Sequence, residues 1–252
     1  MDRSEFFVVV PFYNEVRGIG STLAALAAQS DREFTLVLVD NASTDDTVAV
    51  VREFFAVHPG VATHQILERE KGTGAASDTG FRFAIEHGAK YIARTDADCL
   101  PDIHWIANIK RAFANDALEF VIGDIKPRFD EGAITFVDCV FIPVLFFVAA
   151  SYGWLVHNGK EFKYRYKIVA GNNLAITADL YLRSGGFPRS CIEELHEDRI
   201  LGDRVRVLTT RARVKRDVVV YNSLRRLRRY GYLKTFLWYW DHKYMPRDVD
   251  VR

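Results

Sequence analysis

Short apolar runs that alternate with amphipathic stretches are the feature that most restricts the fold of this chain. Phe6–Val10 and Thr35–Val39 are continuous apolar runs rich in β-branched and aromatic residues, and helical spacing follows each of them. Such runs are typical of strands buried on both faces of a parallel sheet. Their repetition predicts βαβ units with right-handed crossovers.

The same alternation continues through the first half of the chain. The spacing predicts further strands at 62–67, 91–95 and 120–122, and helices at 19–29, 47–57, 75–87 and 103–113. The predicted fold class is therefore α/β, with a Rossmann-like, mostly parallel sheet and helices on both faces. Ligands of such sheets bind outside the carboxyl ends of the strands.

Composition narrows the class of protein. The chain has 252 residues, of which 49% are hydrophobic, enough for one sizeable core or two small ones. Its formal net charge of +1 gives no argument for a nucleic-acid partner. The cysteines Cys99, Cys139 and Cys191 are widely spaced and lack a Cys-x-x-Cys pair, which favours reduced thiols in the cytoplasm. No signal-peptide pattern precedes the first apolar run, so we do not expect export.

Two carboxylates follow the predicted strand at 91–95. Side chains of an extended segment alternate faces, so Asp96 and Asp98 are expected to share a side and to converge on one hard cation. Mg²⁺ and ions like it are usually held by one or two carboxylates together with the phosphates of a substrate. The pair therefore predicts a metal and nucleotide site, and a simple acidic turn is the alternative.

Polar residues also follow the first two predicted strands. Asn14 and Glu15 follow the first strand, and Asp40 and Asn41 follow the second. As the last residue of a buried strand, Asp40 is placed to accept hydrogen bonds from a base or a ribose. For the next polar residues, 43–45, capping of the following helix is an equal alternative.

A small-residue turn, Lys71-Gly72-Thr73-Gly74, leads into the predicted helix at 75–87. Glycines allow a close approach of the backbone to a ligand, and the start of a helix favours a phosphate group. A single Gly-x-Gly turn is weak evidence alone, and it gains value from the strand-end residues around it.

In this order, Pro11-x-x-Asn14-Glu15, Asp40-Asn41-x-Ser43-x-Asp45, the Gly72 turn and Asp96-x-Asp98 resemble the nucleotide-sugar half of family 2 glycosyltransferases, which have the GT-A fold. The resemblance covers residues 5 to 125 and extends more loosely to residue 230. It implies an inverting enzyme that uses a nucleotide-sugar donor, most often a UDP-sugar, and Mg²⁺ or Mn²⁺.

The resemblance also implies roles for individual residues. Asp40 would contact the base, Asp96 would face the ribose and the metal, and Asp98 would bind the metal directly. The residues expected to bind the donor are Pro11, Tyr13, Glu15, Asp40, Asn41, Lys71, Gly72, Asp96, Arg226 and Arg229. Where many members carry an Arg-Asn pair in the third helix, this chain departs from the pattern with Asp78-Thr79.

The second half of the chain is expected to bind the acceptor. Segments 170–176 and 183–188 read as a turn that leads into a strand and as a helix end with a loop, and similar segments shape the acceptor pocket in the family. The pair Glu197-Asp198 resembles the family's catalytic Glu-Asp. Asp198 is expected to be the general base and Glu197 is the alternative, while ordinary acidic residues at a helix start are the structural explanation.

Arginines are concentrated near the end of the chain. Arg226-x-x-Arg229-Tyr230 is similar to the Gln/Arg-x-x-Arg-Trp element of processive members, and these cations would cover the diphosphate. Tyr in place of Trp argues against processive synthesis. A surface arginine cluster is the alternative.

Two apolar segments bear on the acceptor. Phe136–Val156 is interrupted by polar residues and is borderline as a spanning helix, so a buried or interfacial helix is expected. The tail at 232–240 is aromatic with basic neighbours, which suits peripheral contact with the inner face of a membrane or a homodimer. A glycan or a lipid-linked hydroxyl acceptor would follow.

One compact unit is expected, made of a donor half at 1–125, an acceptor-side subdomain at 126–222 and a basic, aromatic tail at 223–252. Two other functions compete with glycosyl transfer. A non-catalytic sugar-nucleotide-binding protein would need the aspartate pair but no base. A sugar nucleotidyltransferase would need a Gly-rich, basic loop after the first strand, where this chain has residues 11–15.

Overall fold

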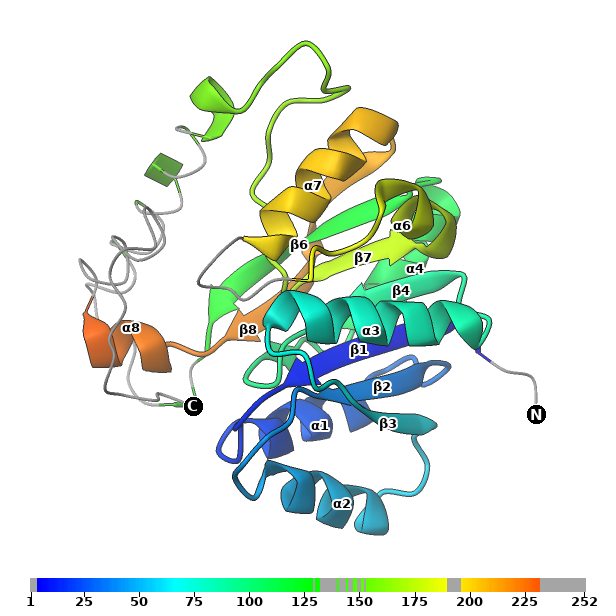
Figure 1. The fold of residues 1–252 in the computed structure, drawn as a ribbon, viewed down its shortest axis with the longest axis vertical. Coiled ribbons are helices and arrows are strands. Elements are labelled where there is room, and N and C mark those ends of the chain that lie inside the picture. The colour runs from blue at the N-terminus through cyan, green and yellow to red at the C-terminus, as the bar shows by residue number, and fades with distance from the viewer. Residues whose placement is uncertain are drawn as a thin grey trace.

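One mixed sheet organises the chain in the computed structural model (Figure 1). The structure describes residues 4–128, 130–131, 153–189 and 196–231, together with 140, 144, 147, 148 and 151. Within these residues the sheet has eight strands in the order β3-β2-β1-β4-β7-β6-β8-β5. This arrangement confirms the predicted α/β class with a mostly parallel sheet.

The first half of the chain forms the parallel part of the sheet. Its strands are β1 (Phe6–Phe12), β2 (Thr35–Asp40), β3 (Thr63–Leu67) and β4 (Tyr91–Arg94), and its helices are α1 (Ile19–Ala27), α2 (Thr47–Val57) and α3 (Thr73–Glu86). β1 pairs in parallel with both β2 and β4. The predicted elements of this half are therefore present, and the carboxyl ends of β1, β2 and β4 meet at one edge.

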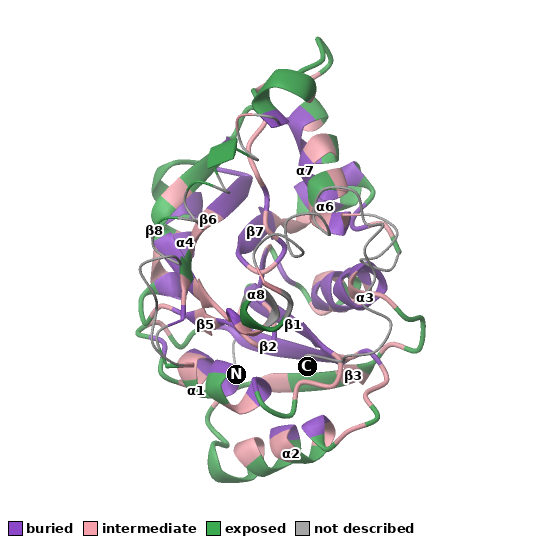
Figure 2. Ribbon diagram, turned by 90° about the vertical axis from the view of Figure 1, so that its left-hand side faces the viewer, coloured by how far each residue is buried: buried purple, intermediate pink, exposed green. Residues whose placement is uncertain are grey.

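Every residue of β1 is buried, because the two faces of the sheet support separate hydrophobic clusters. Val8 and Val10 pack on one face with residues of α1, while Phe7 and Val9 pack on the other with residues of α3. Figure 2 shows the buried residues along the sheet and on the sides of the helices that face it. The unbroken apolar run in the sequence reflects this double burial.

The second half adds strands in both directions. β7 (Leu174–Thr177) lies between β4 and β6 (Phe120–Pro127) and is antiparallel to both. β8 (Ala212–Asn222) runs parallel to β6, and the short β5 (Leu100–Pro101) pairs with β8 at the edge. β6 contains the predicted strand at 120–122 and runs in the same direction as β4, but β7, from much later in the chain, lies between them.

Four helices complete the described fold: α4 (Trp105–Asn115), α6 (Ala178–Ser184), α7 (Glu197–Leu208) and the short α8 (Arg225–Tyr230). Residues of α4 join the cluster on the α1 face, and residues of α6 and α7 join the cluster on the α3 face. Among the described residues, no helix is long and apolar enough to cross a membrane. Most of segment 136–156 and all of the tail at 232–252 lie outside the described residues.

Candidate active site

The loops after β1 and β2 hold each other in place. Asn14, at a φ of 52°, accepts a hydrogen bond from the Thr44 amide at 2.8 Å, and its own amide donates to the Ser43 hydroxyl at 3.1 Å. The Asp40 carboxylate accepts from the Ser43 amide at 2.8 Å. Asp45 accepts from the amide of Thr47, the first residue of α2, whereas Asp46, the residue before the helix, makes no side-chain capping bond.

Asn41 ties the end of β2 to the loop before α3. Its amide nitrogen donates to the main-chain oxygens of Glu68 and Glu70 at 3.1 and 2.7 Å, and its amide oxygen accepts from the Gly72 amide at 2.9 Å. The side chain is buried, and both of its donor hydrogens are used by the backbone. Asn41 therefore positions the Gly72 turn, whereas the sequence suggested contact with the ligand itself.

Tyr13 and Lys71 meet beside this loop. The Lys71 ammonium lies 3.8 Å from the centre of the Tyr13 ring and donates to the main-chain oxygens of Asn41 and Ala42. Gly72 has a φ of 140°, a backbone conformation that favours glycine, and α3 begins at the next residue. The structure thus brings together three of the predicted donor-binding residues, Tyr13, Asn41 and Lys71. Pro11 is buried within β1, one strand residue before the loop.

Asp96 and Asp98 lie in a turn rather than on an extended strand. β4 ends at Arg94, and the Cys99 amide donates to the Asp96 main-chain oxygen at 3.2 Å. The alternation argument for a shared side was therefore wrong, because the strand stops two residues before Asp96. The turn is held by Thr22, whose hydroxyl donates to the Ala97 oxygen at 2.8 Å, and by Arg128, which donates to the Asp98 oxygen at 2.8 Å.

Arg94 connects Asp96 to the second half of the chain. Its Nε and Nη2 donate to Asp96 Oδ1 at 3.2 and 3.1 Å, and its Nη1 lies 3.3 Å from Glu197 Oε1 at the start of α7. The guanidinium is buried and packs against Gly171, where an added Cβ would lie 2.9 Å from Cζ. Sequence reasoning missed this residue, although a cation within an apolar strand was a signal for buried carboxylates.

The neighbours Glu197 and Asp198 have different surroundings. Glu197 is buried, and this burial raises its pKa to about 7 although the Arg94 guanidinium opposes the shift. Asp198 is half-buried and accepts from the Gly171 amide at 3.0 Å and from the Arg199 amide at 2.7 Å. The two amides fix the orientation of the Asp198 carboxylate, and only this member of the pair is also open to solvent.

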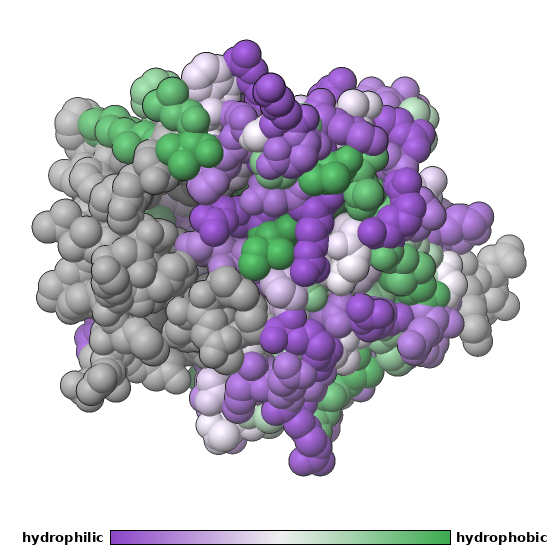
Figure 3. Space-filling view, turned by 45° about the horizontal axis from the view of Figure 1, so that its top comes forward, coloured by the Kyte–Doolittle hydropathy of each residue, from purple (hydrophilic) through white to green (hydrophobic). Residues whose placement is uncertain are grey.

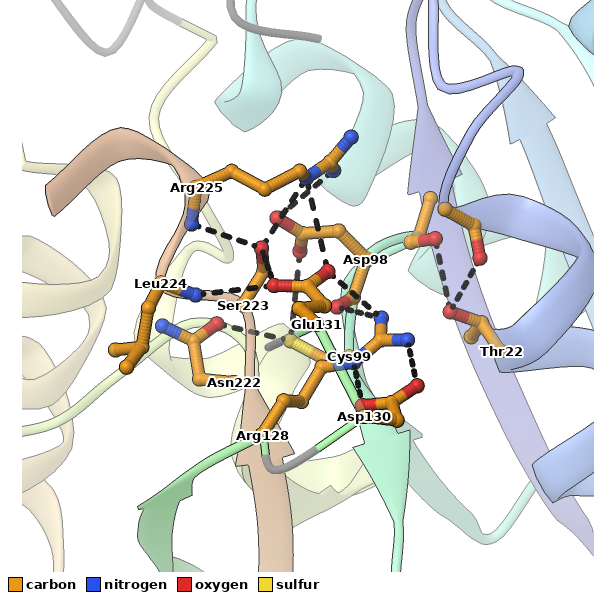
Figure 4. Close-up of polar contacts among 12 residues, drawn as sticks. Thr22, Asp98, Cys99, Arg128, Asp130, Glu131, Asn222, Ser223, Leu224 and Arg225 are labelled. Carbon is orange, nitrogen blue, oxygen red and sulfur yellow. Dashed lines mark hydrogen bonds and ion pairs between the residues drawn. The ribbon is translucent and has the colours of Figure 1, made fainter. Parts of the chain in front are cut away.

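Arg225, at the start of α8, points toward Asp98 in the turn after β4 (Figure 4). Its Nη2 donates to Glu15 Oε2 at 2.6 Å. The same nitrogen lies 3.4 Å from Asp98 Oδ2, and Figure 4 shows this ion pair. Glu15 and Asp98 are close because Gly18 lies between them: a Cβ there would be 3.0 Å from Glu15 Oε2 and 3.1 Å from the Asp98 Cα. The sequence pointed to Arg226 and Arg229, but Arg229 is exposed and the Arg226 side chain lies outside the described residues.

The carboxylates of this site can hold a hard cation only if a bound ligand supplies further oxygen atoms. Among the described residues, no group of three or more His, Cys, Asp or Glu side chains is placed to hold a metal. Asp98 supplies carboxylate oxygens, and a guanidinium already stands beside them as a cation. One or two carboxylates completed by phosphate oxygens match the way proteins hold Mg²⁺, so the residues fit such an ion.

Asp78 lies in α3 at the position where the sequence has Asp-Thr in place of an Arg-Asn pair. It joins the two halves of the molecule. It is buried and accepts hydrogen bonds from the Tyr181 hydroxyl of α6 at 2.9 Å and from Arg82 at 2.8 Å. Arg189 adds a contact at 3.4 Å and also pairs with Glu68 and Glu70. The position therefore holds the second half of the chain against α3.

Comparisons with known proteins indicate the family of this chain. The family model described as "Glycosyl transferase family 2" matches residues 7–159. Similar proteins include the glycosyltransferase AglE of Haloferax volcanii, 25% identical over 50% of this chain and 40% of that protein. Another is the UDP-N-acetylglucosamine–dolichyl-phosphate N-acetylglucosaminyltransferase of Methanococcus voltae, 27% identical over 46% of this chain and 50% of that protein. The matches thus span half or less of these relatives.

Solved structures show the same fold. The mannosyltransferase PcManGT from Pyrobaculum calidifontis, in complex with GDP-Man and Mn²⁺, matches 96% of this chain and 66% of that chain, with a TM-score of 0.65 and 26% identity. TarS of S. aureus, in complex with UDP-GlcNAc, matches 86% of this chain and 58% of that chain with a TM-score of 0.63. At 16% identity, the second likeness concerns the fold alone.

Proposed function

We propose that this chain, which belongs to glycosyl transferase family 2, transfers a sugar from a nucleotide diphosphate to a hydroxyl acceptor with inversion. One observation carries the proposal: Arg94 contacts both Asp96, on the donor side, and Glu197, next to the candidate base. A metal and nucleotide site and a base would then lie at the same edge of the sheet, as direct displacement requires.

On the donor side, the loops after β1 and β2 would hold the nucleotide. Tyr13, Asp40 and the loop positioned by Asn41 supply an aromatic ring, a carboxylate and backbone amides for a base and a ribose. Mg²⁺ or Mn²⁺ held by Asp98, with Asp96 beside it, would supply Lewis-acid neutralisation of the departing diphosphate. We propose a UDP-sugar as the donor, and the GDP-Man complex of the 26% identical mannosyltransferase makes a GDP-sugar the alternative.

On the acceptor side, Asp198 would remove the proton from the attacking hydroxyl. Amides from Gly171 and Arg199 orient its carboxylate, and its half-buried position leaves it open to an acceptor. Glu197 is less suited because it is buried against Arg94. Glu197 is therefore the second choice, and a single base without a nucleophilic carboxylate implies inversion.

A lipid-linked acceptor at a membrane surface is the finer part of the proposal. The exposed apolar residues Phe147 and Leu155, both 72% exposed, lie within segment 136–156, and basic residues at 160, 163, 165 and 167 follow it. Figure 3 shows hydrophobic groups separated by hydrophilic residues on one face of the molecule. An apolar segment with basic neighbours suits an anionic membrane surface, and a homodimer contact is the alternative.

The test is a screen of UDP- and GDP-sugars for hydrolysis and for transfer to simple hydroxyl acceptors, with Mn²⁺ and with EDTA. We expect turnover of one nucleotide class that EDTA abolishes. Donor binding without turnover, both with every acceptor tested and without any acceptor, would support a non-catalytic binding protein instead. Co-sedimentation with anionic but not neutral liposomes is expected for the membrane contact, and a stable dimer without liposome binding would contradict it.

A further inference from the structure

A cation of the chain itself stands at the position proposed for the metal. Arg225 Nη2 donates to Glu15 Oε2 at 2.6 Å and lies 3.4 Å from Asp98 Oδ2. Asp98 is the residue proposed to bind the metal, and Glu15 belongs to the predicted nucleotide pocket. A guanidinium at this distance from Asp98 repels a second cation, because both charges compete for the same carboxylate.

The rest of the Arg225 side chain is anchored independently of these two carboxylates. Its Nε donates to the Ser223 hydroxyl at 3.1 Å and lies 3.8 Å from Glu131 Oε1. Glu131 in turn accepts from the Ser223 hydroxyl at 2.6 Å and from the Leu224 amide at 3.3 Å. The start of α8 is therefore held in place even if the end of the guanidinium changes its partners (Figure 4).

One part of the guanidinium lacks a partner within the described residues. Nη1 of Arg225 is buried and makes no hydrogen bond there. A buried donor that is not hydrogen-bonded is costly, and an anionic oxygen is its strongest partner. Arg225 thus faces two carboxylates with one nitrogen and still has a donor available for a further anion.

We propose that Arg225 couples the binding of the metal to the binding of the nucleotide diphosphate. Without a nucleotide, the guanidinium neutralises Glu15 and Asp98 and keeps the affinity for a divalent ion alone low. A diphosphate attracts the guanidinium through its oxygens, which makes Asp98 available to the metal. Metal and nucleotide therefore strengthen each other's binding, and by linkage the strengthening factor is the same for both. This inference rests on the proposed function of Asp98.

The test measures binding rather than turnover. Mn²⁺ binding is followed by the electron paramagnetic resonance signal of free Mn²⁺, with and without UDP or GDP, for the wild type, Arg225→Met and Arg225→Lys. For Arg225→Met we expect roughly tenfold tighter binding of Mn²⁺ alone, roughly tenfold weaker binding of the nucleotide, and little remaining coupling between them. Arg225→Lys keeps the charge and is expected to retain weak binding of Mn²⁺ alone.

Arg213→Met, at the opposite end of β8, makes the same change in net charge and is expected to leave the Mn²⁺ affinity unchanged. Unchanged or weaker binding of Mn²⁺ alone in a folded Arg225→Met protein would overturn the inference and leave the proposed metal site standing. Absence of Mn²⁺ binding to the wild type, even with either nucleotide, would overturn both the metal site and the inference. Circular dichroism of each variant shows whether it is folded.

Discussion

Arg94 and Glu197 lie 103 positions apart in the chain, yet Nη1 of the arginine is 3.3 Å from Oε1 of the glutamate and both side chains are buried. The same guanidinium holds Asp96 at 3.1 Å. This ion pair fixes the start of α7, and with it Asp198, relative to the turn that carries Asp96 and Asp98. The geometry of the proposed reaction therefore depends on one buried cation.

Replacing Arg94 with Met should destabilise the fold and remove transfer activity. At a pH well above 7, where Glu197 is ionised, its carboxylate would remain buried without its cation, and breaking a buried pair in this way costs about 3 to 5 kcal/mol. The double variant Arg94→Met, Glu197→Gln removes the stranded charge and should recover part of that loss. Urea denaturation of the wild type, both single variants and the double variant measures the coupling, and purely additive losses would contradict the ion pair.

The stability of the protein should fall with rising pH because of Glu197. Burial raises the pKa of this carboxyl from 4.5 to about 7, with Arg94 opposing the shift. Between these two values the folded state binds more protons than the unfolded state. The stabilisation is therefore fully present below 4.5 and is lost as the pH rises through about 7. The free energy of unfolding of the wild type should decline across this window relative to Glu197→Gln. A constant difference between the two proteins would show that the pKa is not raised.

Replacing Asp198 with Asn should abolish transfer and leave binding of the donor intact. Removal of a general base costs about 10² to 10⁴-fold in rate, whereas metal-dependent binding of the nucleotide does not involve this side chain. Turnover numbers and calorimetric nucleotide affinities with Mn²⁺ check both parts. If Glu197→Gln loses the rate and Asp198→Asn keeps it, the roles of the two residues are exchanged. If Asp198→Asn loses binding as well, the residue has a structural role.

Two glycines at the start of the chain's first helix offer a matched pair. A Cβ at Gly18 would lie 3.0 Å from Glu15 Oε2 and 3.1 Å from the Asp98 Cα, so Gly18→Ala should push these groups apart and weaken binding of Mn²⁺ with nucleotide. At Gly20 the nearest atom is 3.8 Å away, and Gly20→Ala should leave binding unchanged and stabilise α1 by about 0.5 to 1 kcal/mol. Thermal unfolding and calorimetry distinguish them, and equal effects on binding would contradict the close contact at Gly18.

Loss of the Asn41 side chain should release the loop before α3. Asn41→Ala removes three hydrogen bonds to residues 68–72, for which we expect about 1 to 3 kcal/mol of stability and weaker nucleotide binding. Asn41→Asp keeps an oxygen for the Gly72 amide but lacks both donors, and should lie between the wild type and Asn41→Ala. If nucleotide affinity falls and the stability of both variants stays unchanged, Asn41 instead contacts the ligand directly.

Much of the first half of the chain was predictable from the sequence. The runs at 6–10 and 35–39 lie in β1 and β2, and the helix at 47–57 has the predicted bounds. These elements follow from hydrophobic periodicity, which depends only on residues that are close together in the sequence. The strand ends also identified the carboxylates around the site, although β4 ended earlier than predicted and the aspartates lie in a turn.

The pairing between distant segments was not predictable in this way. β7 enters the sheet antiparallel between β4 and β6, because its apolar residues are buried in the clusters on both faces of the sheet. A local sequence pattern does not indicate a strand partner 80 residues away. The same holds for Asp78, which the sequence showed only as a departure from a motif. Its partners Tyr181 and Arg189 lie 103 and 111 positions later.

The sequence by itself determined the α/β class, the order of the elements in the first half and the acidic and amide side chains at the strand ends, since these depend on short-range periodicity. Only the tertiary structure decided which arginine pairs with which carboxylate. Arg94 reaches Glu197 across 103 positions, and Arg225 reaches Glu15 across 210. An ion pair depends on distance in space and on burial, and the packing of the whole sheet and its helices, not the adjacent residues, brings these charges together.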